Sequence, residues 1–207
     1  MSKIQAVADA VAAGKAKLVG GLVQEALDDG CQAVDVLNAM IDAMGVVGER
    51  FKNNEIFVPE MLVAARAMKK GVEVLKPHLA SGSAGVCGKM VIGTVAGDLH
   101  DIGKNLVAMM IESAGFEVID LGVDVPTEKF IETVKANPIV GCSALLTTTM
   151  PALKATVEAL NAQDFRGNIK VMVGGAPITQ EFADEIGADA YTADAASAAQ
   201  KAKELAS

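Results

Sequence analysis

Short strand-like runs alternate with helical stretches over the second part of the chain, and this alternation limits the possible folds more than any other feature. Apolar, β-rich runs are predicted at 90–95, 116–121, 139–142, 170–173 and 188–191. Helical stretches are predicted near 103–114, 127–136, 150–162, 179–186 and 195–205. Alternation of this kind produces βαβ units. The sequence therefore predicts an α/β fold: a Rossmann-like (flavodoxin-like), doubly wound parallel sheet of five strands with helices on both faces.

The first 80 residues differ, because their apolar residues recur at helical spacing and strand signals are absent. Four helices are indicated by Ile4, Val7 and Val11; by Leu18, Leu22, Val23 and Leu27; by Val34, Leu37, Ile41 and Met44; and by Met61, Leu62, Ala65, Met68 and Val72. Gly14, Gly30 and the segment 53–59 provide the predicted breaks. Four antiparallel helices with short connections form a bundle.

A run of small residues, Ser81-Gly82-Ser83-Ala84-Gly85, lies between these two patterns. Such composition is typical of a flexible linker. We therefore expect a helical-bundle domain at 1–85 and an α/β domain at 86–207.

Composition argues against several functions. The net charge is -8 and only 3% of the 207 residues are aromatic, so a basic, ring-bearing surface for nucleic acid is not expected. The three cysteines are far apart and form no C-x-x-C pair, which favours reduced thiols. No apolar run approaches the roughly 18 residues that a membrane span needs, so we expect a soluble, cytoplasmic protein without a membrane partner.

A histidine stands in the turn between the first predicted strand and its helix, inside Gly97-Asp98-Leu99-His100-Asp101-Ile102-Gly103. Open α/β sheets bind ligands at the carboxyl ends of their strands, where this turn lies. The turn does not match a phosphate-binding loop, because five residues separate Gly97 from Gly103 and Asn105 follows Lys104. The glycines also lack the spacing of a dinucleotide-binding motif.

The simplest alternative is that Asp101 caps the helix, Gly103 packs and His100 is solvated. Three further carboxyl-edge segments weigh against it: Ser143 to Thr149, Gly174-Gly175-Ala176-Pro177 and Tyr191 to Ala195. Hydroxyl groups there offer hydrogen bonds to a polar ligand, and the paired glycines let a bulky group approach the backbone. Together these segments indicate a ligand channel beside His100.

The pattern Asp98-x-His100-x-x-Gly103, then Ser143-x-Leu145, then Gly174-Gly175 resembles the signature of cobalamin-binding domains. The helical part resembles the helical domain that accompanies them, notably in Val47-Gly48-Glu49-Arg50-Phe51 and Phe57-Val58-Pro59-Glu60-Met61. The resemblance covers essentially the whole chain. It is closest to the small corrinoid proteins of methyltransferase systems, and the matching region of cobalamin-dependent methionine synthase is also similar.

The resemblance implies a role for each matching residue. His100 would be the lower axial ligand of cobalt, in place of the cofactor's own base, and Asp98 would hydrogen-bond its other nitrogen. Ser143 would extend that relay or contact the nucleotide tail, for which Gly103, Gly174 and Gly175 would leave room. The implied cofactor-binding residues are Gly97, Asp98, His100, Asp101, Ile102, Gly103, Ser143, Leu145, Thr147, Gly174, Gly175, Tyr191 and Ala195.

The upper face of the cofactor needs an apolar lid, and the resemblance implies Phe57, with Met61 as a second candidate, although Met and Phe at helical spacing are usually core residues. His78 has no counterpart in the motifs and is expected at the surface. Cys142 is expected to be a small buried thiol.

The function implied is that of a methyl carrier that binds cobalamin (methylcobalamin, cob(I)alamin or a related corrinoid) with its base displaced by histidine. It would take a methyl group from a methylated donor through a substrate-specific methyltransferase. It would then yield the methyl to a second methyltransferase acting on tetrahydrofolate or a similar acceptor. Such a chain is a subunit and not an enzyme on its own, and a reductive activating protein is a further expected partner.

Three alternative functions are less favoured than the methyl carrier. The same domains could form a cobalamin-dependent sensor, which predicts an attached DNA-binding or signalling segment. An adenosyl-dependent mutase subunit shares the histidine turn but usually lacks the four-helix domain. A flavodoxin-like nucleotide binder would not need His100.

Overall fold

The computed structural model describes residues 2–79 and 87–206. The described residues form two compact units, one of residues 2–79 and the other of nearly all of residues 87–206. The predicted linker, Ser81-Gly82-Ser83-Ala84-Gly85, lies outside the described residues. No helix in the described part is long and apolar enough to cross a membrane.

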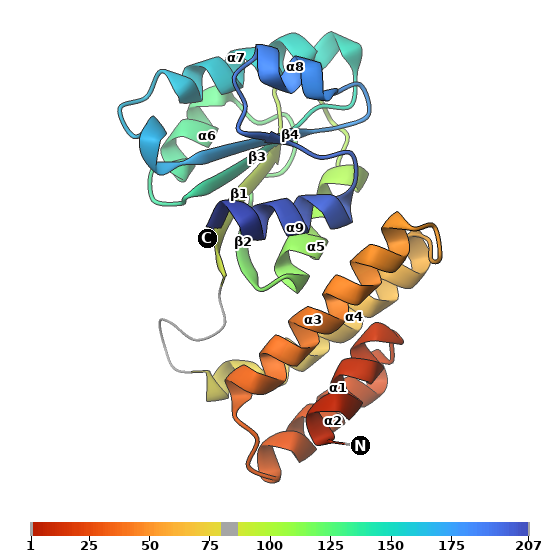
Figure 1. Cartoon of the computed structure of the whole chain (residues 1–207). Coiled ribbons are helices and arrows are strands. Elements are labelled where there is room, and N and C mark those ends of the chain that lie inside the picture. The colour runs from red at the N-terminus through yellow and green to blue at the C-terminus, as the bar shows by residue number, and fades with distance from the viewer. Residues whose placement is uncertain (1, 80–86, 207) are drawn as a thin grey trace. The chain divides into compact units, whose positions relative to one another are not determined.

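The first unit consists of helices over its described length (Figure 1). They are α1 (Lys3–Ala12), α2 (Ala16–Asp28), α3 (Ala33–Lys52) and α4 (Val58–Leu75), with a short 3-10 turn at Lys76–His78. The hydroxyl of Ser2 caps α1 by accepting a hydrogen bond from the backbone N–H of Gln5 at 3.1 Å. Gly14 (φ +66) and Gly30 (φ +86) lie between the first helices, at the predicted breaks.

Two details of the helical unit differ from the sequence prediction. Helix α4 begins at Val58, so Pro59 lies in its first turn and not in the predicted break. Proline is favoured in the first turn because a backbone N–H at that position would have no partner within the helix. Leu18 is 56% exposed, and the neighbouring Val19 is buried instead. A one-residue shift of this kind arises because adjacent positions lie only about 100° apart around a helix.

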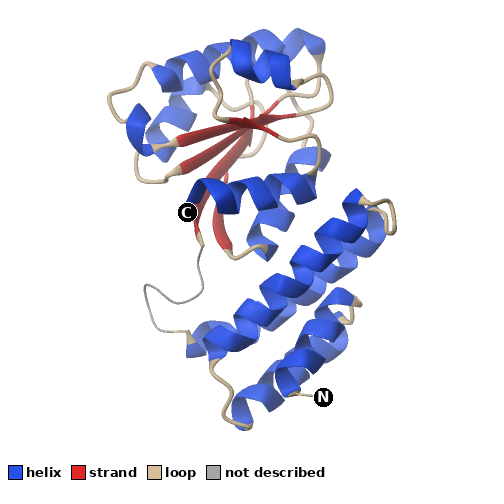
Figure 2. Ribbon diagram, in the orientation of Figure 1, coloured by secondary structure: helices blue, strands red, loops and turns tan. Residues whose placement is uncertain are grey.

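The second unit is a five-stranded, fully parallel sheet with the strand order β2-β1-β3-β4-β5. The strands are β1 (Gly88–Thr94), β2 (Phe116–Asp120), β3 (Ile139–Ser143), β4 (Lys170–Gly174) and β5 (Ala190–Tyr191). The helices are α5 (Ile102–Ser113), α6 (Thr127–Val134), α7 (Met150–Asn161), α8 (Gln180–Glu185) and α9 (Ala195–Ala206). Helices α5 and α9 lie on one face of the sheet, and α6, α7 and α8 lie on the other (Figures 1 and 2). The predicted α/β fold is confirmed.

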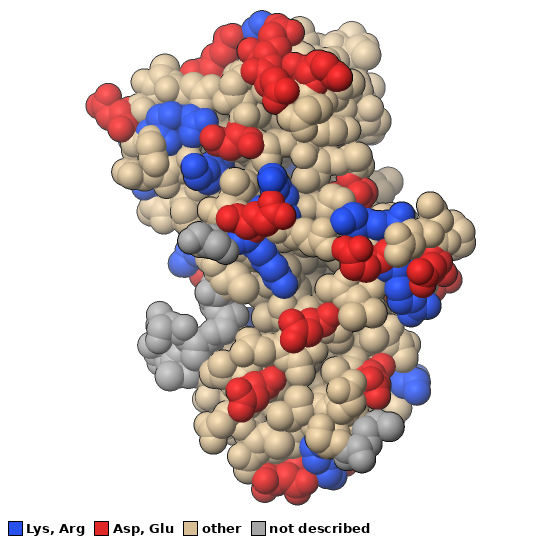
Figure 3. Space-filling view, viewed as in Figure 1, with Lys and Arg blue, Asp and Glu red and all other residues tan. Residues whose placement is uncertain are grey.

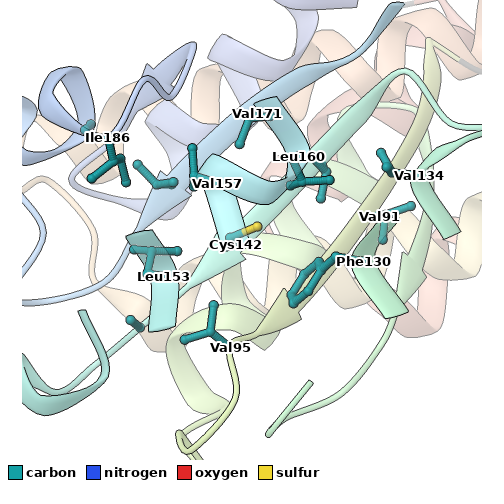
Figure 4. Packing of buried hydrophobic residues seen from close by; sticks show 14 of the residues in the cluster. Val91, Val95, Phe130, Val134, Cys142, Leu153, Val157, Leu160, Val171 and Ile186 are labelled. Carbon is teal, nitrogen blue, oxygen red and sulfur yellow. The ribbon is translucent and has the colours of Figure 1, made fainter. Parts of the chain in front are cut away.

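The core of this unit lies mainly between the sheet and the helices α6, α7 and α8. Its side chains include Val91 and Val95 near β1, Phe130 and Val134 of α6, and Leu153, Val157 and Leu160 of α7, as Figure 4 shows. The β-branched residues of the central strands β1, β3 and β4 are buried on both faces, as expected for a parallel sheet covered on both sides. This packing fixes the strand ends from which the loops of the candidate site extend.

Candidate functional site

Three neighbouring strands end at the same level of the sheet. Thr94, the last residue of β1, is opposite Ser143 of β3, and Ser143 is opposite Gly174 of β4. The loops that follow these strands therefore begin side by side at the carboxyl edge. The histidine turn, residues 95–101, joins β1 to α5 at this edge.

The carboxylate of Asp98 lies at the centre of this edge and has no solvent exposure. Its Oδ1 accepts hydrogen bonds from the backbone N–H of His100 at 3.0 Å and faces the Nδ1 of the same residue at 3.0 Å. Its Oδ2 accepts from the N–H of Leu145 at 2.7 Å and from the hydroxyl of Thr149 at 2.8 Å. Each oxygen thus has two partners, which satisfies the carboxylate fully.

Two opposing effects act on the ionisation of Asp98. Burial disfavours the charged form, but hydrogen bonds from the Leu145 and His100 amides, the Thr149 hydroxyl and the His100 ring together hold the pKa of this carboxyl well below its usual range. Asp98 is therefore an anion at neutral pH, enclosed by donors.

The two ring nitrogens of His100 have different surroundings, because Nδ1 faces the carboxylate of Asp98 and Nε2 does not. Because the partner of Nδ1 is an anion that only accepts, we infer that Nδ1 carries the proton and that Nε2 has a free lone pair. The side chain is 51% exposed, so that lone pair is accessible from outside the unit. A neutral imidazole fixed in this tautomer is a common metal ligand.

The backbone of the turn is also held in place. The buried hydroxyl of Thr94 donates to the carbonyl oxygen of His100 at 2.9 Å. Gly97 adopts φ +79, a conformation that favours glycine. Asp98 accepts from the amide two residues on, which forms an Asx turn and explains why Asp fits this position.

The segments that carry His100 and the partners of Asp98 also expose large aliphatic side chains. Leu99, which precedes His100, is 72% exposed, and Ile102, two residues after His100, is 85% exposed. Leu145 and Leu146, which follow β3, are 39% and 40% exposed, and the amide of Leu145 binds the same carboxylate as the ring. Apolar side chains that gather around a polar group are typical of a ligand site.

The hydroxyl that binds Asp98 differs from the predicted one. The relay was predicted to run through Ser143, but the structure places Thr149 on Oδ2 of Asp98. In the run Thr147-Thr148-Thr149, the first two residues are exposed and only Thr149 is buried, because the 3-10 turn Thr147–Thr149 points one hydroxyl inward. The threonine run was visible in the sequence, but the member that faces the carboxylate was not. The predicted tail contacts of Ser143 and Thr147 stay predictions.

The glycines that were predicted to leave room for a ligand have different surroundings. A Cβ atom on Gly103 would meet nothing within 4 Å, and one on Gly174 would meet only the Thr192 carbonyl, at 3.5 Å. At Gly175 (φ +130), however, a Cβ would lie 1.7 Å from the carbonyl oxygen of Ala144. Glycine at 175 is thus required by the contact between the loops after β3 and β4, whatever ligand binds.

The remaining predicted residues are spread over both units. Tyr191 is partly buried at the end of β5, and Ala195 is buried at the start of α9. In the helical unit, Phe57 is 63% exposed, whereas Met61 has no exposed surface and packs in the core of the bundle. Burial therefore favours Phe57 over Met61 as a residue that contacts a ligand.

Lys104 and Cys142 are buried ionisable groups of the α/β unit. Lys104 of α5, which the sequence analysis did not single out, is buried and donates to both carboxylate oxygens of Asp120, at 2.7 Å and 2.6 Å. Cys142 is buried as predicted, and burial raises the pKa of its thiol to about 12. The thiol is therefore neutral and a poor ligand.

Comparisons with known proteins identify the family to which the chain belongs. Two family models, both described as a B12 binding domain, match residues 3–76 and 88–202. A dimethylamine corrinoid protein of Methanosarcina acetivorans is 43% identical over 98% of this chain and 96% of its own length. A cobalamin-binding protein of Desulfitobacterium hafniense has a crystal structure that matches with a TM-score of 0.83, at 33% identity over 98% of both chains.

A third relative comes from the crystal structure of the methanol:cobalamin methyltransferase complex of Methanosarcina barkeri. A chain of that complex matches with a TM-score of 0.84 and 31% identity, over 99% of this chain and 79% of that one. The matches extend over both units, at identities that show common descent and not only a common fold. The chain therefore belongs to the family of cobalamin-binding corrinoid proteins of methyltransferase systems.

Proposed function

We propose that this protein is a methyl carrier that binds its corrinoid with His100 as the metal ligand, in place of the cofactor's own base. The observation that carries the proposal is the paired arrangement of Asp98 and His100. A buried anion holds Nδ1, and Nε2 remains free on a half-exposed ring. A solvated histidine on a surface turn would not require a buried carboxylate with four hydrogen-bond partners.

The residues around His100 fit such a group on three counts. The ring supplies one nitrogen with a fixed tautomer, which is what a metal ligand requires. Leu99 and Ile102 offer exposed apolar surface beside it for a large, flat macrocycle. Gly103 has open space beside its Cα, as a passage for a tail would need.

When bound, the corrinoid supplies a cobalt ion that takes up and releases the methyl group. The protein's own residues then have separate tasks. His100 would offer its Nε2 to the metal, and Asp98 holds the proton at Nδ1. Thr149 and Leu145 hold Asp98 in place, and the exposed aliphatic side chains would help to exclude water once the cofactor is bound.

We further propose that the chain works as a subunit and not as an enzyme by itself. The relatives are named for dimethylamine and for a methanol:cobalamin methyltransferase complex, which supports a small methylated compound as the donor. A substrate-specific methyltransferase would load the methyl group, and a second methyltransferase would pass it to tetrahydrofolate or a similar acceptor. A reductive activating protein would restore an oxidised cofactor.

The test begins with loading the purified protein with hydroxocobalamin and following it through gel filtration. We expect coloured protein whose visible spectrum shows nitrogen ligation. The variant His100→Ala should retain some corrinoid but lose that spectral signature, since His100 is the one histidine in the cobalamin-domain motif. His78→Ala is the matched control and should behave like wild type, because His78 lies in the 3-10 turn after α4, in the helical unit.

The second stage adds a reductant, a partner methyltransferase and its methyl donor. The carrier function predicts that the spectrum alternates between a reduced and a methylated form as donor and acceptor are supplied. A protein that stays colourless after gel filtration, or a spectrum that His100→Ala leaves unchanged, would contradict the proposal.

A further inference from the structure

The loop between β2 and α6, residues 121–126, is held firmly against the end of β1. The N–H of Leu121 donates to the carbonyl of Ile92 at 2.8 Å, and the N–H of Val125 donates to the carbonyl of Thr94 at 3.0 Å. The pairing of Val95 with Val125 continues the parallel arrangement beyond the strands. The base of this loop is thus an extension of the sheet, and its tip has little freedom.

The tip carries Asp124, whose backbone conformation is unusual. Its φ is +52, and among the described residues the only other non-glycine residue with a positive φ is Asn54, at +58. This conformation costs on the order of 1 kcal/mol for a residue with a Cβ atom, and it persists only where the surroundings determine it. The contacts of Asp124 must therefore offset this conformational cost.

Asp124 makes two hydrogen bonds to the histidine turn. Its backbone N–H donates to the carbonyl oxygen of Asp98 at 2.9 Å, and its carboxylate accepts from the N–H of Gly97 at 2.7 Å. These two groups lie at opposite ends of the dipeptide Gly97-Asp98. One residue thus holds the backbone on both sides of the Asp98 side chain, and so fixes the direction in which that side chain leaves the turn.

We propose that Asp124 is a positioning residue for the imidazole of His100 and acts through Asp98. The Asp124 carboxylate and amide set the backbone of Gly97 and Asp98, the Asp98 carboxylate then holds Nδ1, and the ring presents Nε2 in one orientation. For the metal-bound state this inference rests on the proposed function, but the effect on the ring itself does not. Asp124 is exposed and need not touch a ligand.

The first experiment observes the two imidazoles of the ligand-free protein by long-range proton–nitrogen NMR. The chain has only two histidines, so His78 serves as an internal reference. Spectra are recorded at about pH 9, well above the ordinary titration range of histidine. In wild type, we expect the ring nitrogens of His100 to show one dominant tautomer, with the proton on Nδ1.

Two variants separate the hydrogen bond from the backbone conformation. Asp124→Gly suits a positive φ but removes the acceptor for Gly97, so we expect His100 to lose its tautomer preference and to resemble His78. Asp124→Asn tolerates a positive φ and keeps an oxygen acceptor, so it should retain the wild-type signals. Asn54→Gly is the matched control for a positive-φ position and should leave the signals of His100 unchanged.

Each other outcome would overturn the proposal. Wild-type signals of His100 in Asp124→Gly would show that Asp124 does not position the ring. Loss of the tautomer in Asp124→Asn would show that hydrogen-bond acceptance is not its role. Failure of Asp124→Gly to fold, judged by circular dichroism, while Asn54→Gly folds, would assign Asp124 to global stability instead.

A second experiment separates this inference from the proposed function. Partners of metal-binding histidines change metal affinity by about 10-fold to 100-fold, and Asp124 acts one step further away. We therefore expect Asp124→Gly to bind hydroxocobalamin about 10-fold more weakly, with a weaker signature of nitrogen ligation, and Asp124→Asn to bind normally. If wild type itself shows no nitrogen ligation, the proposed function fails, and the NMR result still decides the role of Asp124.

Discussion

At the scale of single residues, the site depends on how a buried carboxylate is kept ionised. Asp98 has no exposed surface, and an ion in such a place is costly unless donors surround it. Its partners come from its own turn (His100) and from the segment after β3 (Leu145 and Thr149). The carboxylate therefore joins two loops that are far apart in sequence. Leu145 lies 47 residues after Asp98, and Thr149 lies 51 residues after it.

Replacing Thr149 by valine should test the hydroxyl while keeping the shape of the side chain. Thr149→Val leaves Oδ2 of Asp98 with one donor, and we expect a loss of about 1–2 kcal/mol in the free energy of unfolding. The matched control is Thr156→Val, since Thr156 is also buried and its hydroxyl bonds Thr127 at 2.9 Å. Urea unfolding should show both losses, but only Thr149→Val should alter the spectrum of the loaded protein. An unchanged spectrum would separate Thr149 from the metal site.

Acid should weaken the protein through Asp98 in a predictable direction. The pKa of Asp98 is lower in the folded protein than the value of about 3.9 for an unfolded chain. Its stabilising contribution is thus fully present above about pH 5 and is lost as the pH falls below about 4. Asp98→Asn should be less stable than wild type by on the order of 2 kcal/mol at pH 7, and this gap should narrow at about pH 3.

Urea unfolding of the ligand-free protein at several pH values measures this gap. Asp101→Asn is the control, because Asp101 is exposed and its replacement should follow the wild-type curve. A gap that stays constant across the acid range would show that ionisation of Asp98 does not contribute.

At the scale of elements, the strands and helices follow from periodicity, whereas the fine structure of the site does not. The five strand positions were predictable because parallel strands are continuous apolar runs. The histidine turn was also predictable, since its place after β1 sets it at the carboxyl edge. The choice of Thr149 over Ser143 and the contacts of Asp124 depend on side-chain direction and on loop packing across 27 to 51 positions, which local patterns do not encode.

The connection between β2 and α5 offers a prediction at this scale. Lys104 is almost fully buried, and its ammonium group is paired with Asp120, which remains 40% exposed on its side chain. Asp120→Ala would leave the buried ammonium without its anion, so we expect a loss of about 2–3 kcal/mol in stability. Lys104→Met, which removes the buried charge and leaves Asp120 to water, should cost less.

An exposed ion pair that also involves β2 is the control for that comparison. Lys89 of β1 and Glu117 of β2 lie 3.0 Å apart, and both side chains are about half exposed, at 50% and 51%. Glu117→Ala should therefore change stability by less than about 1 kcal/mol. If Asp120→Ala costs no more than Glu117→Ala in urea unfolding, the Lys104 pair does not hold α5 to β2.

At the scale of the whole molecule, both units expose large apolar side chains. The α/β unit does so at Leu99 and Ile102, beside the polar network of Asp98 and His100, and the helical unit does so at Phe57, Val46 and Val58. Acidic and basic side chains are interspersed over the coloured part of the face seen in Figure 3, and the net charge is -8. Together these features favour an apolar ligand surface and a protein partner over a polyanion.

Replacing Phe57, just before α4, and replacing Met61, within α4, should have different effects. The two variants test what the helical unit contributes. Phe57 is 63% exposed, so Phe57→Ala should change the free energy of unfolding by less than about 0.5 kcal/mol. If Phe57 shields the cofactor, this variant should nevertheless speed the oxidation of the reduced, loaded protein in air. Met61 is fully buried, so Met61→Ala should cost about 2–5 kcal/mol through the cavity that it leaves.

Calorimetry of the ligand-free protein measures the stability of each variant, and the visible spectrum of the reduced protein follows its oxidation. A ligand that binds only the folded protein raises its melting temperature. If Phe57 shields the metal but does not hold the cofactor, hydroxocobalamin should raise the melting temperature of Phe57→Ala about as much as that of wild type. An oxidation rate equal to that of wild type would remove Phe57 from the lid. A faster rate with an unchanged melting temperature would assign the helical unit a protective role that is independent of its contribution to the fold.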